Sequence, residues 1–195
     1  MSDSPFVSRA GLKLEHALNA FDFDVTGISC SDLGCNVGGF TDCLLQRGAS
    51  HVVAVDTGYG TFAWKLRSDE RVTTLERTNV LHYEPREQVD LVVIDLGWTP
   101  QKLALPAGIK WTNCGHIITL IKPHYELTKE EKEVESVGEG LSDDAVSRVI
   151  TRIKTLCQEL SLEILGETLS PIRGKKSSKK GEGNCEYLML LKNQP

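Results

Sequence analysis

Three charged residues follow or border apolar runs of the chain, where charge is costly unless it is paired or used. Asp95 and Lys122 each come directly after such a run, and Glu186 lies near the start of the last predicted strand. Carboxylates and amines that meet at one place can orient one another and transfer protons during a reaction. We therefore predict that these three residues belong to one reactive cluster.

The cluster depends on the direction of the last strand. In open parallel sheets, ligands bind beyond the carboxyl ends of the strands, which is where Asp95 and Lys122 lie. Glu186 reaches the same edge if the last strand runs antiparallel to its neighbours. Lys13, on a predicted N-terminal helix, can then complete the cluster, although a lone lysine on a helix is usually solvated.

A second group of residues predicts a site for a nucleotide-like ligand. A strand over residues 28–34 leads into a glycine-bearing turn, 35–39, and then into a helix over 40–47. A second strand, 51–55, ends in Asp56. Such a unit brings backbone close to the ligand, presents free N–H groups at the helix start, and offers a carboxylate to ribose hydroxyls.

The absence of one glycine distinguishes a dinucleotide site from a site for S-adenosylmethionine. The dinucleotide pattern G-x-G-x-x-G, aligned on Gly34 and Gly39, needs glycine at Asn36, where the backbone meets a pyrophosphate. S-adenosylmethionine has no pyrophosphate, so the pattern D-x-G-x-x-x-G-G that starts at Asp32 fits it better. We predict S-adenosylmethionine as the cofactor; the alternative is a turn whose glycines are incidental.

Strands and helices alternate almost throughout the chain, which predicts an α/β fold with a mostly parallel sheet and helices on both faces. Strands are predicted over residues 28–34, 51–55, 72–75, 90–95, 116–121, 162–169 and 184–192. Helices are predicted over residues 8–21 with Ser8 as the cap, over 40–47, after the turn at 97–100, and from a cap at Ser142. The third of these is expected to end near Pro106 and Gly108, because both residue types weaken a helix.

Composition narrows the class of protein. A chain of 195 residues suits one well-cored domain, and a net charge of −5 argues against broad non-specific binding of nucleic acid. Its 6 cysteines show no C-x-x-C pair, so no metal site is predicted. The start lacks the features of a signal peptide, and no apolar run is long enough to span a bilayer. We expect a cytoplasmic protein that does not insert into membranes.

Seven short motifs together resemble the methyltransferase domain of the TlyA branch of the FtsJ-like family. In chain order they are SRAGLKL at 8–14, DLGCNVGGFTD at 32–42, AVDTGYG at 54–60, ERTN at 76–79, VVID at 92–95, IKP at 121–123 and NCEYL at 184–188. The resemblance implies a Rossmann-like class I methyltransferase fold, with a seven-stranded, mostly parallel sheet whose last strand is antiparallel. It also implies a single domain over residues 1–195.

Members of this family methylate ribose 2′-hydroxyls of RNA with a Lys-Asp-Lys-Glu tetrad, which by motif falls on Lys13, Asp95, Lys122 and Glu186. A lysine in water ionises near pH 10.4 and is a poor base at neutral pH. A neighbouring cation and burial both favour the neutral amine. We therefore expect Lys122, flanked by Lys13, to accept the hydroxyl proton while Asp95 and Glu186 orient the amines. This chemistry requires no metal.

The glycine-turn pattern, the motifs and the anionic charge of an RNA substrate together indicate candidate binding residues. For the cofactor they are Asp32, Gly34, Gly38, Gly39, Phe40, Asp56, Asn79 and Asp95; for RNA phosphates they are Arg9, Lys175, Lys176, Lys179 and Lys180. Asn79 is equally well explained as a turn residue, and the four lysines as a solvated loop. Trp98 is a candidate for stacking on an RNA base, but core packing is the favoured interpretation.

The sequence departs from the family pattern in two places. The small N-terminal RNA-binding domain usual in the TlyA branch is absent from it, so we expect a partner that supplies RNA affinity. Leu96-Gly97-Trp98 stands where Val-Ser-Phe is usual. The predicted function is 2′-O-methylation of RNA, with ribosomal RNA as the expected substrate. The alternatives are a module that binds S-adenosylmethionine or RNA without turnover, and a methyltransferase for small molecules.

Overall fold

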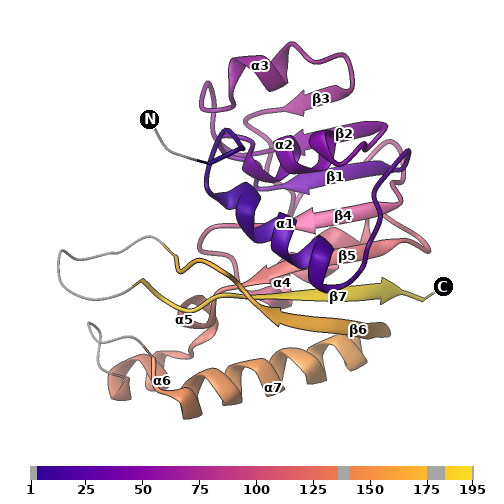
Figure 1. Ribbon diagram of the computed structural model, residues 1–195. Helices are drawn as coiled ribbons and strands as arrows, with labels where there is room; N and C mark the ends of the chain where they lie inside the picture. The colour runs from indigo at the N-terminus through magenta and orange to yellow at the C-terminus, as the bar shows by residue number, and fades with distance from the viewer. Residues whose placement is uncertain (1–3, 136–140, 175–182, 195) are drawn as a thin grey trace.

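One sheet organises the chain. The computed structural model describes residues 4–135, 141–174 and 183–194. Within them, seven strands lie in the order β3-β2-β1-β4-β5-β7-β6 (Figure 1). Their bounds are β1 Ser29–Leu33, β2 His51–Val55, β3 Val72–Leu75, β4 Leu91–Ile94, β5 His116–Ile121, β6 Leu162–Leu169 and β7 Tyr187–Asn193. Only β7 runs against its neighbours, β5 and β6, so the predicted seven-stranded sheet with an antiparallel last strand is confirmed.

Helices cover both faces of the sheet. Their bounds are α1 Ala10–Ala20, α2 Gly39–Gln46, α3 Trp64–Arg67, α4 Gln101–Ile109, α5 Pro123–Glu126, α6 Lys129–Val134 and α7 Asp143–Glu159. Residues of α1 and α2 pack into one apolar cluster, and residues of α4 and α7 pack into the other (Figure 1). In β4, Leu91 and Val93 point into the first cluster while Val92 and Ile94 point into the second. A central strand buried on both faces therefore reads as a continuous apolar run.

One predicted helix start was wrong, and one predicted helix end was right only in part. The N-terminal helix begins at Ala10 with Arg9 as its N-cap, although the Ser8 hydroxyl still accepts a bond from the Ala10 N–H at 3.3 Å. The helix α4 continues through Pro106 but ends at Ile109, directly after Gly108. Its apolar side is buried against the sheet, and a Cβ at Gly108 would lie 2.7 Å from Ile94 Cδ1, so glycine allows this helix to approach β4.

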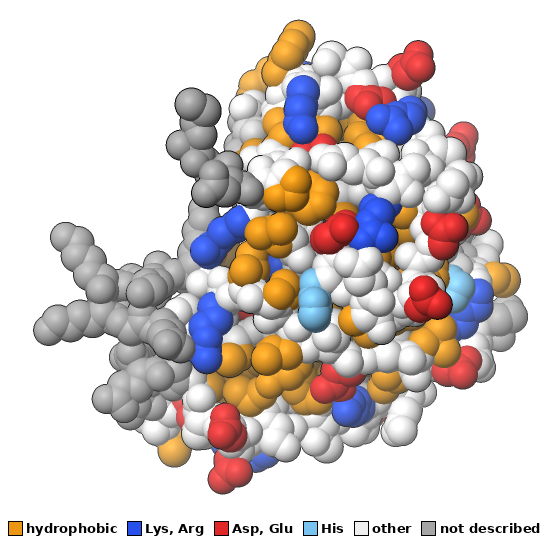
Figure 2. All heavy atoms as spheres, viewed as in Figure 1, with side chains coloured by type: hydrophobic (Ala, Val, Ile, Leu, Met, Phe, Trp, Pro, Cys, Tyr) orange, Lys and Arg blue, Asp and Glu red, His pale blue; other side chains and the backbone are white. Residues whose placement is uncertain are grey.

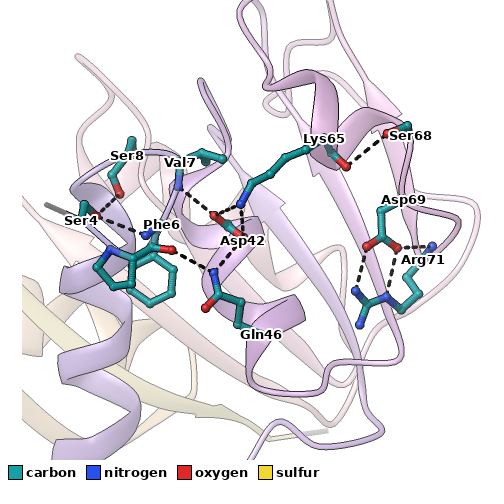
Figure 3. A network of polar contacts seen from close by, with 11 residues as sticks. Ser4, Phe6, Val7, Ser8, Asp42, Gln46, Lys65, Ser68, Asp69 and Arg71 are labelled. Carbon is teal, nitrogen blue, oxygen red and sulfur yellow. Dashed lines mark hydrogen bonds and ion pairs between the residues drawn. The ribbon is translucent and has the colours of Figure 1, made fainter. Parts of the chain in front are cut away.

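Asp42 holds the segment before α1 in place (Figure 3). One oxygen of this buried carboxylate accepts the backbone N–H of Val7 at 2.7 Å, and the other accepts the Gln46 side-chain amide at 3.1 Å. Gln46 also donates to the carbonyl of Pro5, and Lys65 of α3 pairs with Asp42 at 3.0 Å. The start of α1 is thereby fixed relative to both α2 and α3.

Close contact between α1 and α2 depends on Gly39. A Cβ at this position would lie 2.9 Å from both the Gly11 nitrogen and the Ala10 Cβ, and it would also meet the Ser8 hydroxyl. Backbone atoms cannot move aside as a flexible side chain can. The first residue of α2 must therefore lack a side chain if α1 is to keep its place.

We expect Gly39→Ala to lower the free energy of unfolding by about 1–3 kcal/mol, the usual effect of overpacking. Gly97→Ala is the matched control, because a Cβ there has nothing within 4 Å. Urea denaturation of the two variants measures the difference. Equal stability of both would show that α1 can shift without cost, contrary to this account of the α1–α2 contact.

Candidate active site

A cavity of about 440 Å³ lies at the carboxyl edge of the sheet, and all four predicted tetrad residues line it. Lys13 reaches the cavity from α1, Asp95 and Lys122 follow β4 and β5, and Glu186 directly precedes β7. The antiparallel pairing of β5 with β7 brings the last two residues to the same edge. The geometry required of Glu186 by the sequence argument is therefore present.

Within the cavity, the four residues form two ion pairs. Lys13 pairs with Glu186, and the two residues are only 7% and 3% exposed. Lys122 pairs with Asp95 and also donates to the carbonyl of Leu96 at 3.3 Å. Each charge thus has an opposite partner, which limits the cost of burying it. Lys13 is not the solvated helix residue that a lone lysine usually is.

Asp32 is a buried acid, and only one of its two carboxylate oxygens has hydrogen-bond partners among the described residues. One oxygen, Oδ2, accepts the backbone N–H of Thr41 at 2.9 Å and its hydroxyl at 2.6 Å. The other, Oδ1, has no partner among the described residues, although Asp32 lines the cavity. Burial raises the pKa of Asp32 to about 7, against the lowering effect of the bonds from Thr41. An unpartnered carboxylate oxygen in a cavity is an acceptor for a cationic group.

The glycine turn has two separate structural roles. Gly34 has φ of +93°, and a Cβ there would lie 2.6 Å from the carbonyl oxygen of Asp95, so the turn passes tightly over β4. A Cβ at Gly38 would instead meet Leu66 and lie 2.8 Å from a ring carbon of Phe62. Gly38 and Gly39 therefore serve packing between helices. Phe40 is buried and lines the cavity.

A second cavity, of about 430 Å³, adjoins the first and shares Gly34, Asn36, Asp95, Gly97 and Trp98 with it. Asp56 lines it, and its carboxylate accepts the backbone N–H groups of Asn36 at 2.8 Å and Gly58 at 2.7 Å. Asn79 also lines it while its side-chain oxygen accepts the Leu81 N–H at 3.0 Å. Both interpretations of Asn79, turn residue and ligand contact, are compatible with this position.

The two cavities suit a nucleoside with a charged amino-acid tail. Asp32, whose buried Oδ1 has no partner among the described residues, lines the first cavity, and Asp56, whose carboxylate can accept from hydroxyls, lines the second. Gly34, which has no side chain, lines both cavities. The residues present therefore fit S-adenosylmethionine, which carries an ammonium group at one end and a ribose toward the other.

Three aromatic residues at the first cavity were not assigned correctly from the sequence. Trp98 is 84% exposed, so the expectation that it packs in the core was wrong. Its ring lies 4.9 Å from that of Tyr125, which lies 4.0 Å from that of His124. His124 and Tyr125 were not singled out, although they lie two and three residues after the tetrad lysine and their position after β5 was a usable signal.

Basic residues at the site are few within the described part of the chain. Arg9 is exposed, lines the first cavity and donates to the carbonyl of Arg173 at 3.4 Å. On the face shown in Figure 2, basic side chains are interspersed with acidic ones and form no single patch. The predicted phosphate contacts Lys175, Lys176, Lys179 and Lys180 lie outside the described residues.

The described helices also bear on the question of membranes. None of them combines the length and apolar character that a bilayer crossing needs.

Comparison with known proteins gives relatives over the full chain. TlyA of Mycobacterium tuberculosis, named as a 16S/23S rRNA (cytidine-2′-O)-methyltransferase, is 40% identical over 99% of this chain. YqxC of Bacillus subtilis is 36% identical over 95% of it. The chain spans 70% of the length of the first relative and 65% of the second. A solved structure from Streptococcus thermophilus that carries a hemolysin name superposes with a TM-score of 0.88. It is 32% identical, and the match covers 99% of this chain and 69% of that one.

The family assignment rests on the whole length of the fold. The profile of the FtsJ-like methyltransferases matches residues 6–188, which include α1 with Lys13 and the start of β7 with Glu186. The relatives match the same span at 36% to 40% identity. The chain therefore belongs to the FtsJ-like methyltransferase family.

Proposed function

We propose that this chain is an RNA methyltransferase that transfers a methyl group from S-adenosylmethionine to a ribose 2′-hydroxyl, with Lys13, Asp95, Lys122 and Glu186 as the catalytic tetrad. One observation supports the proposal above all others: two lysine–acid pairs line a single cavity beside the glycine turn of the predicted cofactor site. The relatives support ribosomal RNA as the substrate class, and the name of the mycobacterial protein specifies cytidine.

Residues of both cavities hold the cofactor. Asp32 accepts the ammonium group through Oδ1, and Asp56 accepts from the ribose while keeping its bonds to the turn. Gly34 and Asn79 line the second cavity and would hold the nucleoside part of the cofactor. When bound, S-adenosylmethionine supplies an electrophilic methyl group on a positively charged sulfur.

Lys122 acts on the nucleophile. With S-adenosylmethionine bound, methylation of the 2′-oxygen would release the hydroxyl proton, and the amine of Lys122, which lines the cavity, would accept it. Asp95 orients that amine in the free protein through their ion pair.

Lys13 and Glu186 hold the substrate side of the cavity. Their pair is more buried than that of Lys122 and Asp95, which suits positioning better than proton transfer. Acceptors on the ribose or its phosphates can bond to the ammonium group of Lys13, while Glu186 keeps that group in place. Positioning of the reacting groups supplies a large part of the rate in such transfers.

The substrate class is tested with labelled cofactor. The protein is incubated with methyl-labelled S-adenosylmethionine and total RNA, with and without ribosomal subunits, and the label is located after nuclease digestion. We expect label on a ribose of ribosomal RNA. Cofactor binding without any transfer would favour the idle binding module, and label in small molecules alone would favour a small-molecule methyltransferase.

We expect Lys122→Ala to abolish methyl transfer while cofactor affinity changes little, because its proposed action is on the hydroxyl. Lys122→Arg should be almost as damaging, since a guanidinium group stays protonated. Lys110→Ala is the matched control, because Lys110 forms an ion pair with Glu84 away from the cavity. Single-turnover rates and calorimetric affinities give the result. An active arginine variant would reduce Lys122 to an electrostatic anchor.

We expect cofactor affinity to fall as pH drops below 7, by roughly tenfold per pH unit, because only ionised Asp32 attracts the ammonium group. Asp32→Asn should bind weakly and without this pH dependence. Calorimetry between pH 5 and 7 measures both effects, because the ammonium group of the cofactor stays protonated in that range. An equally steep curve for the asparagine variant would place the titration elsewhere.

The same variant should gain stability. Burial raises the pKa of Asp32 to about 7, so between about pH 4 and 7 the folded protein keeps a proton on Asp32 that the unfolded chain has lost. This proton stabilises the folded state at low pH, and the stabilisation is lost as the pH rises to about 7. An asparagine side chain does not ionise, so the variant lacks this pH-dependent contribution to stability. The stability of Asp32→Asn relative to the wild type should therefore rise over this pH range by a few kcal/mol in urea denaturation. A constant difference would contradict it.

We expect Trp98→Ala to weaken RNA binding by about tenfold, within the 1–3 kcal/mol typical of base–aromatic stacking. Trp98→Phe should retain most of the affinity, and thermal stability should not change in either variant. Trp64→Ala is the control, since Trp64 is 77% exposed but does not line the cavity. RNA affinity is measured with saturating cofactor. Equal losses of affinity for both tryptophan variants would show that Trp98 contributes no more to RNA binding than an exposed tryptophan outside the cavity.

A further inference from the structure

The three rings beside the tetrad form one array at the cavity. Trp98 follows β4, while His124 and Tyr125 lie on α5, and all three line the same cavity as Lys122. The rings are tilted by 31° and 56° at the two contacts. An array of this kind offers a nucleobase a stacking surface next to the reacting ribose.

His124 differs from its neighbours because its ring nitrogens can read hydrogen-bonding groups. Its Nδ1 is buried and has no hydrogen-bond partner among the described residues. Its Nε2 is not among the buried atoms without a partner, and it makes no hydrogen bond to a described residue. Because His124 lines the cavity while its Nδ1 is buried, we take Nε2 to be the ring nitrogen that faces the cavity.

The environment of His124 keeps the ring neutral. Burial, followed by the positive charges of Lys122 and Lys132, lowers the pKa of His124 to about 4. A neutral imidazole carries one N–H, on either nitrogen. An orphaned buried N–H is rare in proteins, so the proton belongs on Nε2, where water or a ligand can accept from it. His124 is thus a donor without charge.

We propose that the Nε2–H of His124 donates to the base edge of the target nucleotide and selects cytidine over uridine. This inference rests on the proposed function. Cytosine presents a bare acceptor at N3, whereas uracil presents an N–H at the same position, which opposes a second donor. Because the buried Nδ1 has no acceptor for a proton, the ring keeps its proton on Nε2. This nitrogen therefore cannot accept the N3–H of uracil.

A purely structural role for His124 predicts something different. A ring that only fills space beside Tyr125 would be replaced by phenylalanine without any effect on base preference. The test therefore compares two RNAs that differ only by cytidine or uridine at the nucleotide that the wild type methylates. Their kcat/KM ratio is the quantity of interest.

We expect the wild type to prefer cytidine by roughly 10- to 100-fold, the range expected when a buried polar group is left unpaired. In His124→Phe the cytidine rate should fall by about that factor and the uridine rate should not, so that the ratio approaches one. In His124→Gln the amide can present either a donor or an acceptor. It should keep cytidine activity and gain uridine activity.

Two controls accompany these variants. Cofactor affinity by calorimetry should stay unchanged in both, because the proposed contact is to RNA. His116→Phe is the matched histidine, since its ring lies 4.9 Å from Phe23 and it lines a cavity separate from the tetrad. It should leave the ratio at the wild-type value.

A direct measurement of the ring does not depend on activity. In nitrogen-15 spectra of histidine-labelled protein at pH 7, His124 should show a protonated Nε2 and an unprotonated Nδ1. The assignment uses His124→Phe, which removes the signal. A protonated Nδ1, or a doubly protonated ring, would overturn the proposal.

The outcomes separate this inference from the proposed function. If the wild type transfers no methyl group to any RNA, the proposed function fails. If the wild type is active but has no preference for cytidine, or if His124→Phe keeps the preference, only the role of His124 fails.

Discussion

The antiparallel pairing of β7 with β5 is the constraint on which the site depends. Tyr187 pairs with Ile121, so the residue before β7 and the residue after β5 meet at one edge of the sheet. A parallel last strand would carry Glu186 to the opposite end, and Lys13 would be a buried cation without its partner. Removing one partner of a buried pair is far more destabilising than exchanging both. Strand direction and pairing of charge therefore stabilise the same arrangement.

The position of Lys13 depends in turn on a packing contact between helices. Gly39 lets α1 lie against the start of α2, and Asp42 holds the backbone before α1 through Val7. Both residues belong to the stretch whose glycines indicate a ligand site in the sequence. Part of that pattern is thus a packing signal, and it contributes to the site indirectly, by bringing a catalytic candidate from the N-terminal helix to the sheet edge.

The sequence was sufficient for the fold and for the position of the charged cluster, because both follow from patterns along the chain. Sequence patterns predicted β2, β3, β5 and β6 to the residue, and the charged residues after β4 and β5, Asp95 and Lys122, predicted the cavity edge. The sequence predicted α4 but not its continuation through Pro106, which depends on burial against the sheet. Nor did it predict the exposure of Trp98, because whether an aromatic residue is buried depends on tertiary neighbours that no local pattern specifies.

The charges of the site limit how RNA can be drawn to it. The two ion pairs cancel in sum, so the cavity presents little net field to a polyanion, and the whole chain carries −5. Under the proposed function, RNA capture by this chain would rely on local contacts. The candidates for such contacts are Arg9 at the cavity and the exposed ring of Trp98. Phosphate contacts weaken steeply with salt because they release counterions, whereas stacking on a ring involves no ion release. A site that relies mainly on its rings should accordingly bind RNA with a shallow dependence on salt, and a steep dependence would indicate that cations elsewhere in the chain or on a partner supply the attraction.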